Sequence, residues 1–365
     1  MEVYNNQFKY LELRDGSVII IKYIGSADSV TVPATINGKP VTEIDDDAFA
    51  GRENVKVSIS SEVRFGKVSF APNIAATNIQ AAPVQFKTVR LPFKYGVVID
   101  KYTGSETSVK IPATINDLPV IEIGDNAFRK YKALTSITIP DSVEKIGDAA
   151  FFNCSLTSIN IPNSVTKIGY GAFSGCKITS IKIPEGMTEI GDGAFNGLHS
   201  LTSINIPDTV SRIGKSAFMY CSSLTSIKIP NGVKEIGDGA FMSCSSLKSI
   251  NIPGSVTKIN EFTFCDCQSL ISINISDGVT EIGENAFGEC HSLTSINIPS
   301  SVTRINKDAF YGCSSLTSIN IPNSVARIEY GAFSNCRSLA SIKIPYDTKI
   351  DDDAFKNCPA RIIRY

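Results

Sequence analysis

A repeat of 22 or 23 residues constrains this chain more than any other feature of its sequence. The Phe of an Ala-Phe pair stands at positions 128, 151, 173, 195, 218, 241, 264, 287, 310, 333 and 355. In one unit, that of Phe264, Thr takes the place of the Ala. Around it the unit reads approximately Leu-Thr-Ser-Ile-x-Ile-Pro-x-Ser-Val-Thr-x-Ile-Gly-x-x-Ala-Phe-x-x-Cys. Self-similarity at such a period is the signature of a stacked repeat architecture.

Each unit has the pattern of a strand followed by two turns, as residues 293–313 illustrate. Ile296 and Ile298 alternate with serine and asparagine, which is the period of a half-buried strand. Pro299 then ends the strand, because proline has no N–H to donate to a sheet. A stretch rich in Asp, Asn and Gly leads into a tight turn that carries Phe310 to the inside.

A single unit cannot fold alone. Its roughly six apolar side chains contribute about 1.5 to 3 kcal/mol each when fully buried, whereas ordering its backbone costs about 1 to 2 kcal/mol per residue. Neighbouring units must therefore cover each other's open sides. The sequence predicts a repeat solenoid, a leucine-rich-repeat-like right-handed coil of 22–23-residue repeats, made mostly of short β-strands with turns and short helical turns.

The amino-terminal third is less regular and contains a duplication. Residues 21–49 and 100–128 align at an offset of 79 and share Tyr-x-Gly, Pro-Ala-Thr-Ile-Asn and the Ala-Phe ending. Residues 50–92 depart from the period, and we interpret them as degenerate coils with an irregular insertion, in which Val89 to Pro92 read as a strand followed by proline.

Three domains are therefore expected. Residues 1–92 form an amino-terminal module with degenerate coils, and residues 93–128 form a second copy of that module leading into the array. Residues 129–365 form the regular solenoid with a carboxyl-terminal cap. We expect Ile362 and Ile363 to supply the last capping strand, and the array to be complete at that end.

The repeated residues resemble a known family. Leu-Thr-Ser-Ile-x-Ile-Pro followed by Val, Ile-Gly, Ala-Phe and Cys is similar to the repeat of BspA-like leucine-rich-repeat proteins throughout the regular array. The resemblance implies a bacterial protein at the cell surface or secreted, with a role in adhesion and host matrix proteins among its partners. The family motif is a folding motif, so the resemblance transfers no binding residue to this chain.

Composition and charge exclude several classes of function. Only 19% of residues are charged, the formal net charge is -1, and no basic footprint of the kind that nucleic-acid binding needs is present. No stretch of about 18 apolar residues is present, so we expect no membrane insertion. The first ten residues lack the basic and apolar regions of a secretory signal. Either the protein is intracellular or its signal precedes this sequence.

The period also explains the cysteines. Nine of the ten stand three residues after an anchor Phe, and Leu198 and Tyr131 take the same place in two other coils. A position that accepts Leu is apolar, so buried free thiols that pack as small hydrophobic side chains are expected. Cys265 alone is off register, and no His lies close to it in sequence to complete a metal site.

The candidate catalytic residues are not expected to lie close together. His199 and His291 lie four repeats apart and cannot share a proton, which requires contacts of about 3 Å. No P-loop, dinucleotide-binding glycine pattern or HExxH motif is present. Turn chemistry explains a set of recurring acidic residues, namely Glu189, Asp192, Glu235, Asp238, Glu281 and Glu284. We therefore expect no catalytic residue, no cofactor and no metal.

The outward side of the strand is the candidate interaction surface. Serines form one row along it, and a second row runs beside the serines: Thr138, Asn160, Lys182, Asn205, Lys228, Asn251, Asn274, Asn297, Asn320 and Lys343. Solvation and hydrogen bonding between coils would account for these residues equally well. Tyrosines at the loop edges are further candidates, because Tyr anchors interfaces at a low entropy cost: Tyr170, Tyr220, Tyr311 and Tyr330. Packing against neighbouring turns is their alternative role.

Two hypotheses of function remain. The first is a non-catalytic interaction or adhesion module, at the cell surface or secreted, that binds a protein or glycan ligand and acts as a monomer. The second is an intracellular scaffold between proteins in the cytoplasm, which the absent signal and reduced cysteines favour. Neither hypothesis includes a nucleic-acid partner.

Overall fold

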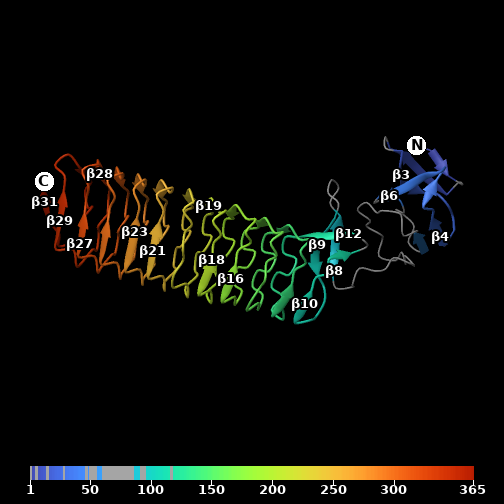
Figure 1. Ribbon diagram of the computed structural model, residues 1–365, viewed down its shortest axis with the longest axis horizontal. Coiled ribbons are helices and arrows are strands. Elements are labelled where there is room, and N and C mark those ends of the chain that lie inside the picture. Colours follow the sequence, from blue (N-terminus) through green and yellow to red (C-terminus); the bar gives the residue numbers. More distant parts are fainter. Residues whose placement is uncertain are drawn as a thin grey trace. The chain divides into compact units, whose positions relative to one another are not determined.

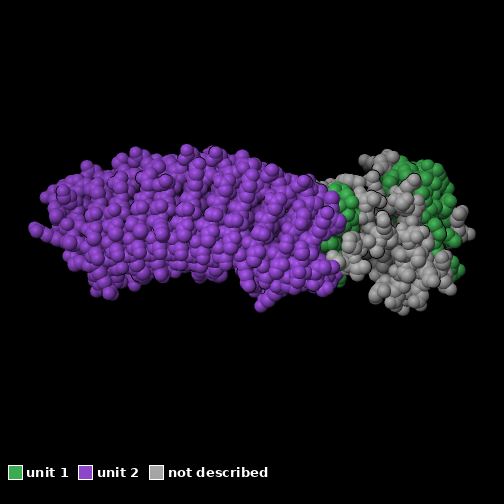
Figure 2. Space-filling view, turned by 60° about the horizontal axis from the view of Figure 1, so that its bottom comes forward, with its two compact units in different colours: residues 1–99, 114–119 green, residues 100–113, 120–365 purple. Residues whose placement is uncertain are grey.

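The protein is described by a computed structural model that covers residues 2–4, 7–13, 16–27, 29–45, 48, 56–59, 86–90, 96–115 and 118–365. It divides into two compact units, coloured separately in Figure 2. Unit 1 comprises residues 1–99 and 114–119, and unit 2 comprises residues 100–113 and 120–365. The three predicted functional domains remain a prediction. None of the described residues lies in a helix, and so none belongs to a helix that could cross a membrane.

Unit 1 is built around one small sheet. Its strands follow the order β1-β2-β3-β6-β5. Their bounds are β1 Glu2–Tyr4, β2 Phe8–Glu12, β3 Val18–Tyr23, β5 Thr35–Ile36 and β6 Lys39–Ile44. The alternation of apolar and polar residues on β2 and β3 turns Phe8, Tyr10, Val18 and Ile20 into a buried core. A separate parallel pair joins β4 (Ser29–Val32) to β7 (Lys56–Ile59), as expected of a degenerate coil.

The predicted duplication is visible as shared structure. Strands β9 (Val97–Tyr102), β11 (Thr114–Ile115) and β12 (Leu118–Ile123) lie 79 residues after β3, β5 and β6. The hydroxyl of Tyr23 accepts from the amide of Ala27 at 3.2 Å, and that of Tyr102 accepts from the amide of Glu106 at 3.3 Å. Strand β8 (Phe86–Arg90) includes the start of the predicted strand-then-proline element, but residues 60–85 and 91–95 lie outside the described residues.

Unit 2 is the predicted solenoid (Figure 1). Its short strands align from coil to coil in two parallel layers, which we call sheets although each consists of several hydrogen-bonded segments. Two coils contribute only an isolated bridge to the first of them, at Asn160 and Ser226. We call the Ser-Ile-Asn strands the first sheet: β10 Ser108–Lys110, β13 Ser136–Thr138, β16 Ser180–Lys182, β18 Ser203–Asn205, β21 Ser249–Ile252, β23 Ser272–Ile275, β25 Ser295–Asn297, β27 Ser318–Asn320, β29 Ser341–Ile344 and β31 Arg361–Arg364. Equivalent residues of successive coils pair in register, for example Ser249 with Ser272. The last strand, β31, pairs with β29, as predicted from Ile362 and Ile363.

The second sheet consists of shorter strands that each end at the Ile of the Ile-Gly motif or its equivalent. They are β14 Lys145–Ile146, β15 Lys167–Ile168, β17 Glu189–Ile190, β19 Arg212–Ile213, β20 Glu235–Ile236, β22 Lys258–Ile259, β24 Glu281–Ile282, β26 Arg304–Ile305, β28 Arg327–Ile328 and β30 Lys349–Ile350, with β12 at the start. Their charged residues also pair in register, for example Glu281 with Arg304. The predicted solenoid of short strands is confirmed.

The segment around each anchor Phe, which we call the turn edge, joins the second sheet to the next strand of the first. In all eleven coils the residues two before and two after the Phe have positive φ, as Asn285 (51°) and Glu289 (59°) do in the coil of Phe287. In that coil the N–H groups of Asn285, Phe287 and Glu289 donate to carbonyls of the following coil, and Phe287 donates to Ala309 at 2.8 Å. Two left-handed residues four positions apart in each coil prevent a helix there, so hydrogen-bonded turns replace the expected short helical turns.

The core of unit 2 is a set of columns that run from coil to coil. The eleven anchor Phe rings stack on one another, and Tyr102 begins the column on Phe128, with centroid distances between 5.0 and 6.1 Å. The Ile, Leu and Val residues of the motif lie beside them, and most are fully buried. Stacking rings and strands at the same spacing forces every coil into one register, and this register fixes which side chains face outward.

Candidate functional site

The predicted interaction row lies on the outer surface of the first sheet. All nine of its Asn and Lys residues are exposed: Asn160, Lys182, Asn205, Lys228, Asn251, Asn274, Asn297, Asn320 and Lys343. Lys182 pairs with Asn205, Asn251 with Asn274, and Asn320 with Lys343 across neighbouring strands. The serine row beside it is exposed as well. The solenoid therefore brings distant residues of the sequence into one regular polar surface.

The side chains of this row make few contacts with one another. Among the described residues, the only ion pair that a member of the row forms joins Lys182 to Glu185 at 4.0 Å, and both side chains are more than half exposed. An exposed pair of this kind contributes little to stability. The amide and ammonium groups of the row are thus available to solvent or to a partner.

A third polar row borders the first two. It consists of the Thr that precedes the Ser in seven of the ten coils, and several of its hydroxyls bond to the preceding coil. The hydroxyl of Thr202 donates to the carbonyl of Thr179 at 3.0 Å, and that of Thr317 donates to the carbonyl of Thr294 at 3.2 Å. Hydrogen bonding between coils, the alternative role considered for the polar rows, applies to this threonine row.

The second sheet carries a charged row that the sequence analysis did not recognise. Glu189, Glu235 and Glu281 were attributed to turn chemistry, but they lie in strands β17, β20 and β24. That prediction was wrong because a strand of two residues is too short to show an alternating pattern. The sequence does carry a signal that could have identified this row. The residue before each Ile-Gly or its equivalent is acidic in some coils and basic in others.

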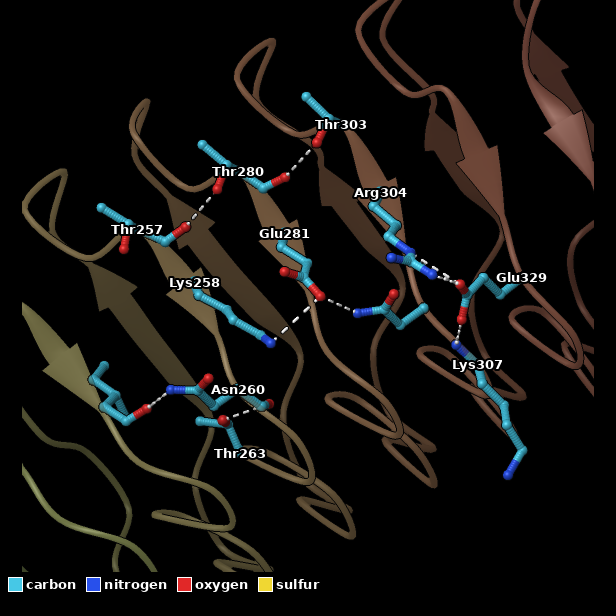
Figure 3. A network of polar contacts seen from close by, with 12 residues as sticks. Thr257, Lys258, Asn260, Thr263, Thr280, Glu281, Thr303, Arg304, Lys307 and Glu329 are labelled. Atoms are coloured by element: carbon cyan, nitrogen blue, oxygen red, sulfur yellow. Dashed lines mark hydrogen bonds and ion pairs between the residues drawn. The ribbon is translucent and has the colours of Figure 1, made fainter.

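Charges on the second sheet pair with each other from coil to coil. Arg212 lies 3.8 Å from Glu189, 2.9 Å from Asp192 and 3.5 Å from Glu235. The carboxylate of Glu281 lies 3.4 Å from the ammonium group of Lys258 (Figure 3). The same carboxylate accepts from the side-chain amide of Asn306 at 2.5 Å. Although burial raises it, the pKa of Glu281 is lowered on balance by Asn306 and Lys258.

The same network continues toward the carboxyl end. Arg304 binds Glu329, whose second oxygen accepts from the backbone N–H of Lys307 at 3.1 Å (Figure 3). Arg327 binds Asp351 at 2.8 Å. A partner that docked on this sheet would have to desolvate or break pairs that already exist. The first sheet, whose Asn and Lys groups have almost no such pairs, is therefore the better candidate surface.

The predicted tyrosines lie on the turn edge, away from the first sheet, and they differ in exposure. Tyr170 is 60% exposed, Tyr330 47% and Tyr220 43%, whereas Tyr311 is half-buried. The ring of Tyr170 lies over the next coil, since a Cβ added at Gly193 would approach it to 2.6 Å. The structure does not place the four together, because they sit at three different positions of the turn. Phe262, 36% exposed, was missed because it precedes an anchor Phe closely and resembles a core residue.

The cysteine column is buried as predicted. Eight of its nine members are buried, and all ten cysteines of the chain are free thiols. Each buried thiol donates to the carbonyl of the anchor Phe in an earlier coil, as Cys290 does to Phe264 at 3.2 Å. Burial raises the pKa of Cys221 to about 12. Such thiols are poor nucleophiles, because the thiolate is the reactive form.

The histidines stay apart in the structure. His291 lies near Glu289, with Nε2 3.2 Å from the carboxylate, and its Nδ1 is 3.0 Å from the carbonyl oxygen of Gly312. His199 belongs to a coil four repeats earlier. Within the described ranges no group of three or more His, Cys, Asp and Glu residues is arranged to hold a metal.

A stack of coils with two parallel sheets, an inward column of Leu and Ile, and no helix among its described residues defines a leucine-rich-repeat β-solenoid. The model of the BspA type leucine rich repeat region, in six copies, matches residues 121–248 and 234–361. The chain therefore belongs to the BspA-type leucine-rich-repeat family, as the resemblance of its motif implied. No curated protein matches the chain.

Solved structures with a similar chain include bacterial repeat proteins. A leucine rich cell surface protein from Faecalibacterium prausnitzii A2-165 is 29% identical, with 100% of this chain and 94% of that chain covered and a TM-score of 0.47. A leucine-rich repeat protein from Bacteroides ovatus ATCC 8483 is 24% identical, with 100% of both chains covered and a TM-score of 0.46. The pneumococcal vaccine antigen PcpA is 19% identical, with 77% and 86% covered and a TM-score of 0.53, a likeness of fold.

Proposed function

We propose that this protein is a non-catalytic binding module, at the cell surface or secreted, whose first sheet takes up an extended protein or glycan ligand. The observation that carries the proposal is the in-register row of exposed Asn and Lys side chains, which form almost no ion pairs within the described protein. Membership of the BspA-type family supports the location. Solenoids commonly bind partners along such a continuous surface.

The chemistry of the row favours a ligand rich in hydrogen-bonding groups. Each amide offers two donors and one acceptor, and three Lys add positive charge at Lys182, Lys228 and Lys343. Strands in a sheet lie about 4.8 Å apart, so one amide or ammonium group is presented at each such step. An extended glycan or polypeptide that runs along the stack could meet several of them in succession, each contact being weak alone.

Catalysis is not part of the proposal. The buried thiols have raised pKa values, and the two histidines stand on separate coils. A catalytic site needs a nucleophile or base within about 3 Å of a partner group.

The test is binding of the purified chain to an array of immobilised matrix proteins and glycans. We expect at least one class to bind, and expect replacement of Asn251 and Asn297 by Glu to weaken that binding about tenfold or more. The matched control replaces Glu235 and Glu281 on the second sheet by Gln. Failure of every class to bind, or equal binding by both variants and the wild type, would contradict the proposal.

A second candidate is an intracellular protein scaffold, favoured by the ten free thiols, which are typical of reducing compartments. Both candidates use the same surface, so the compartment decides between them. Fractionation of the native cells with an antibody against the chain separates the two. Signal in the cell-surface or medium fraction excludes the scaffold, and signal confined to the cytoplasm excludes the surface module.

A further inference from the structure

Two aromatic residues occupy turn-edge positions where the backbone is left-handed. Tyr220 has a φ of 61° and Phe262 a φ of 56°. In the eleven described coils no other aromatic side chain holds such a position, and most of them hold Gly, Asn, Asp or Ser. A bulky side chain is strained in this conformation. Burial does not offset the strain, because the side chains are 43% and 36% exposed.

The two aromatics flank a single coil, that of Phe241. Tyr220 lies on the preceding coil, where its N–H donates to the carbonyl of Met242 at 2.9 Å. Phe262 lies on the following coil, whose Glu261 accepts at 2.8 Å from the N–H of Gly239. Met242 belongs to the coil of Phe241 and is half-buried, and thioethers adapt readily to varied apolar partners. We call Tyr220, Met242 and Phe262 the turn-edge patch.

The central coil has small residues where its neighbours have rings. Gly239 stands in the coil of Phe241 where Phe262 stands in the next, and Ser243 stands where Tyr220 stands in the one before. The rings are therefore not covered by bulky equivalents on the coil between them. This arrangement leaves the two rings exposed on the turn edge.

Acidic groups without ion pairs border the patch. Glu261 is exposed, and Asp266 accepts from the hydroxyl of Ser243 at 3.0 Å and the amide of Gln268 at 2.8 Å. Neither forms an ion pair among the described residues. Several acidic residues elsewhere along the edge have partners within 4 Å, namely Asp238 with Lys215, Glu284 with Lys307 and Glu289 with His291. The exposed rings thus have beside them two carboxylates without ion pairs in the described chain, and Lys215 on the coil of Tyr220 also acts electrostatically on Glu261.

We propose that the turn-edge patch docks a basic, amphipathic polypeptide segment. Its apolar side chains would contact Tyr220, Met242 and Phe262, and its Lys or Arg would pair with Glu261 and Asp266. The proposal deepens the proposed binding function and rests on it, but it concerns a different surface from the Asn and Lys row. The docking proposal depends on two observations together. Tyr220 and Phe262 hold a strained backbone that packing does not explain, and the carboxylates of Glu261 and Asp266 beside them form no ion pair within the described part of the chain.

The test measures fluorescence anisotropy of the full chain with three labelled 14-residue peptides, composed of Leu and Lys, Leu and Glu, or Ser and Lys. The Leu and Lys peptide is expected to bind, more weakly at high salt, and at least about tenfold more tightly than the other two. Phe262→Asn together with Tyr220→Asn should weaken it about tenfold or more. Asn fits the left-handed backbone, so the melting temperature should stay the same or rise.

Two controls separate this proposal from the proposed function. Asn251→Glu with Asn297→Glu, on the first sheet, should leave peptide binding unchanged, whereas Glu261→Gln with Asp266→Asn should remove most of its salt dependence. Equal binding of all three peptides would overturn the docking proposal, and so would unchanged binding by the variant with Phe262→Asn and Tyr220→Asn. Either result would leave ligand binding by the first sheet intact. A fall in the melting temperature of the variant with Phe262→Asn and Tyr220→Asn would show that the two rings stabilise the fold, and this result would also overturn the docking proposal.

Discussion

The two sheets of the solenoid are built from the same coils at the same spacing, yet their outer surfaces differ. Charged side chains on the second sheet bind one another, as Arg212 does with three carboxylates. The first sheet exposes Asn and Lys at equivalent steps with almost no such pairs among the described residues. Because a core shared by both sheets sets the register, stacking does not require the polar groups of the first sheet. The difference therefore indicates which surface is available for a partner.

The largest expected effect is a loss of stability at alkaline pH, caused by the buried thiols of the core that both sheets share. Burial raises the pKa of Cys154 and Cys221 to about 12, whereas an unfolded thiol titrates near 8.5. Above about pH 9 the unfolded chain loses thiol protons that the folded chain keeps, so each such thiol lowers the free energy of unfolding by about 1.4 kcal/mol per pH unit. Urea unfolding followed by circular dichroism between pH 8 and pH 10.5 measures the slope.

A variant with Cys244 and Cys267 replaced by Ala provides the control for this slope. Its stability at pH 8 should be lower, because cavities remain. Its decline with rising pH should be shallower by about 2.7 kcal/mol per pH unit, since two titrating groups are gone. Identical slopes for the variant and the wild type would show that the thiols do not set the alkaline limit.

A matched pair of substitutions tests the two sheets directly. Arg212→Glu should place a fourth carboxylate among Glu189, Asp192 and Glu235 and lower the free energy of unfolding by about 2 kcal/mol. Asn205→Glu introduces the same carboxylate on the first sheet of the same coil, beside Lys182, without removing a positive charge. We expect a change of less than about 0.5 kcal/mol there. Comparable losses in chemical denaturation would remove the distinction between the sheets.

A smaller effect should appear at acidic pH. Asn306 and Lys258 lower the pKa of Glu281 in the folded chain, so this residue stabilises the fold above its unfolded pKa of about 4.3. That stability is lost as the pH falls through the lowered folded pKa. Glu281→Gln should therefore cost about 0.5 kcal/mol at pH 7 and almost nothing at pH 2.5, as urea midpoints at the two values would show. A cost that does not change with pH would point to packing.

The period made most of the fold and one of the candidate surfaces predictable. Once each coil carries Ile at alternate positions, the Asn between them must face outward, and stacking must align Asn251 with Asn274. The charged row could not be predicted in the same way, because strands of two residues carry no alternation. Phe262 was missed for a related reason. A hydrophobic residue two positions before an anchor Phe is interpreted as a core residue, unless the left-handed backbone at that position is known.

Binding by paired surface variants tests the central claim most directly. Once the array of matrix proteins and glycans has identified a ligand, its Kd is measured for the wild type, for Asn251→Glu with Asn297→Glu, and for Glu235→Gln with Glu281→Gln. The account predicts about tenfold or greater loss for the first-sheet variant and little change for the second-sheet variant. Loss confined to the second-sheet variant would contradict it and would assign the binding surface to the paired charges.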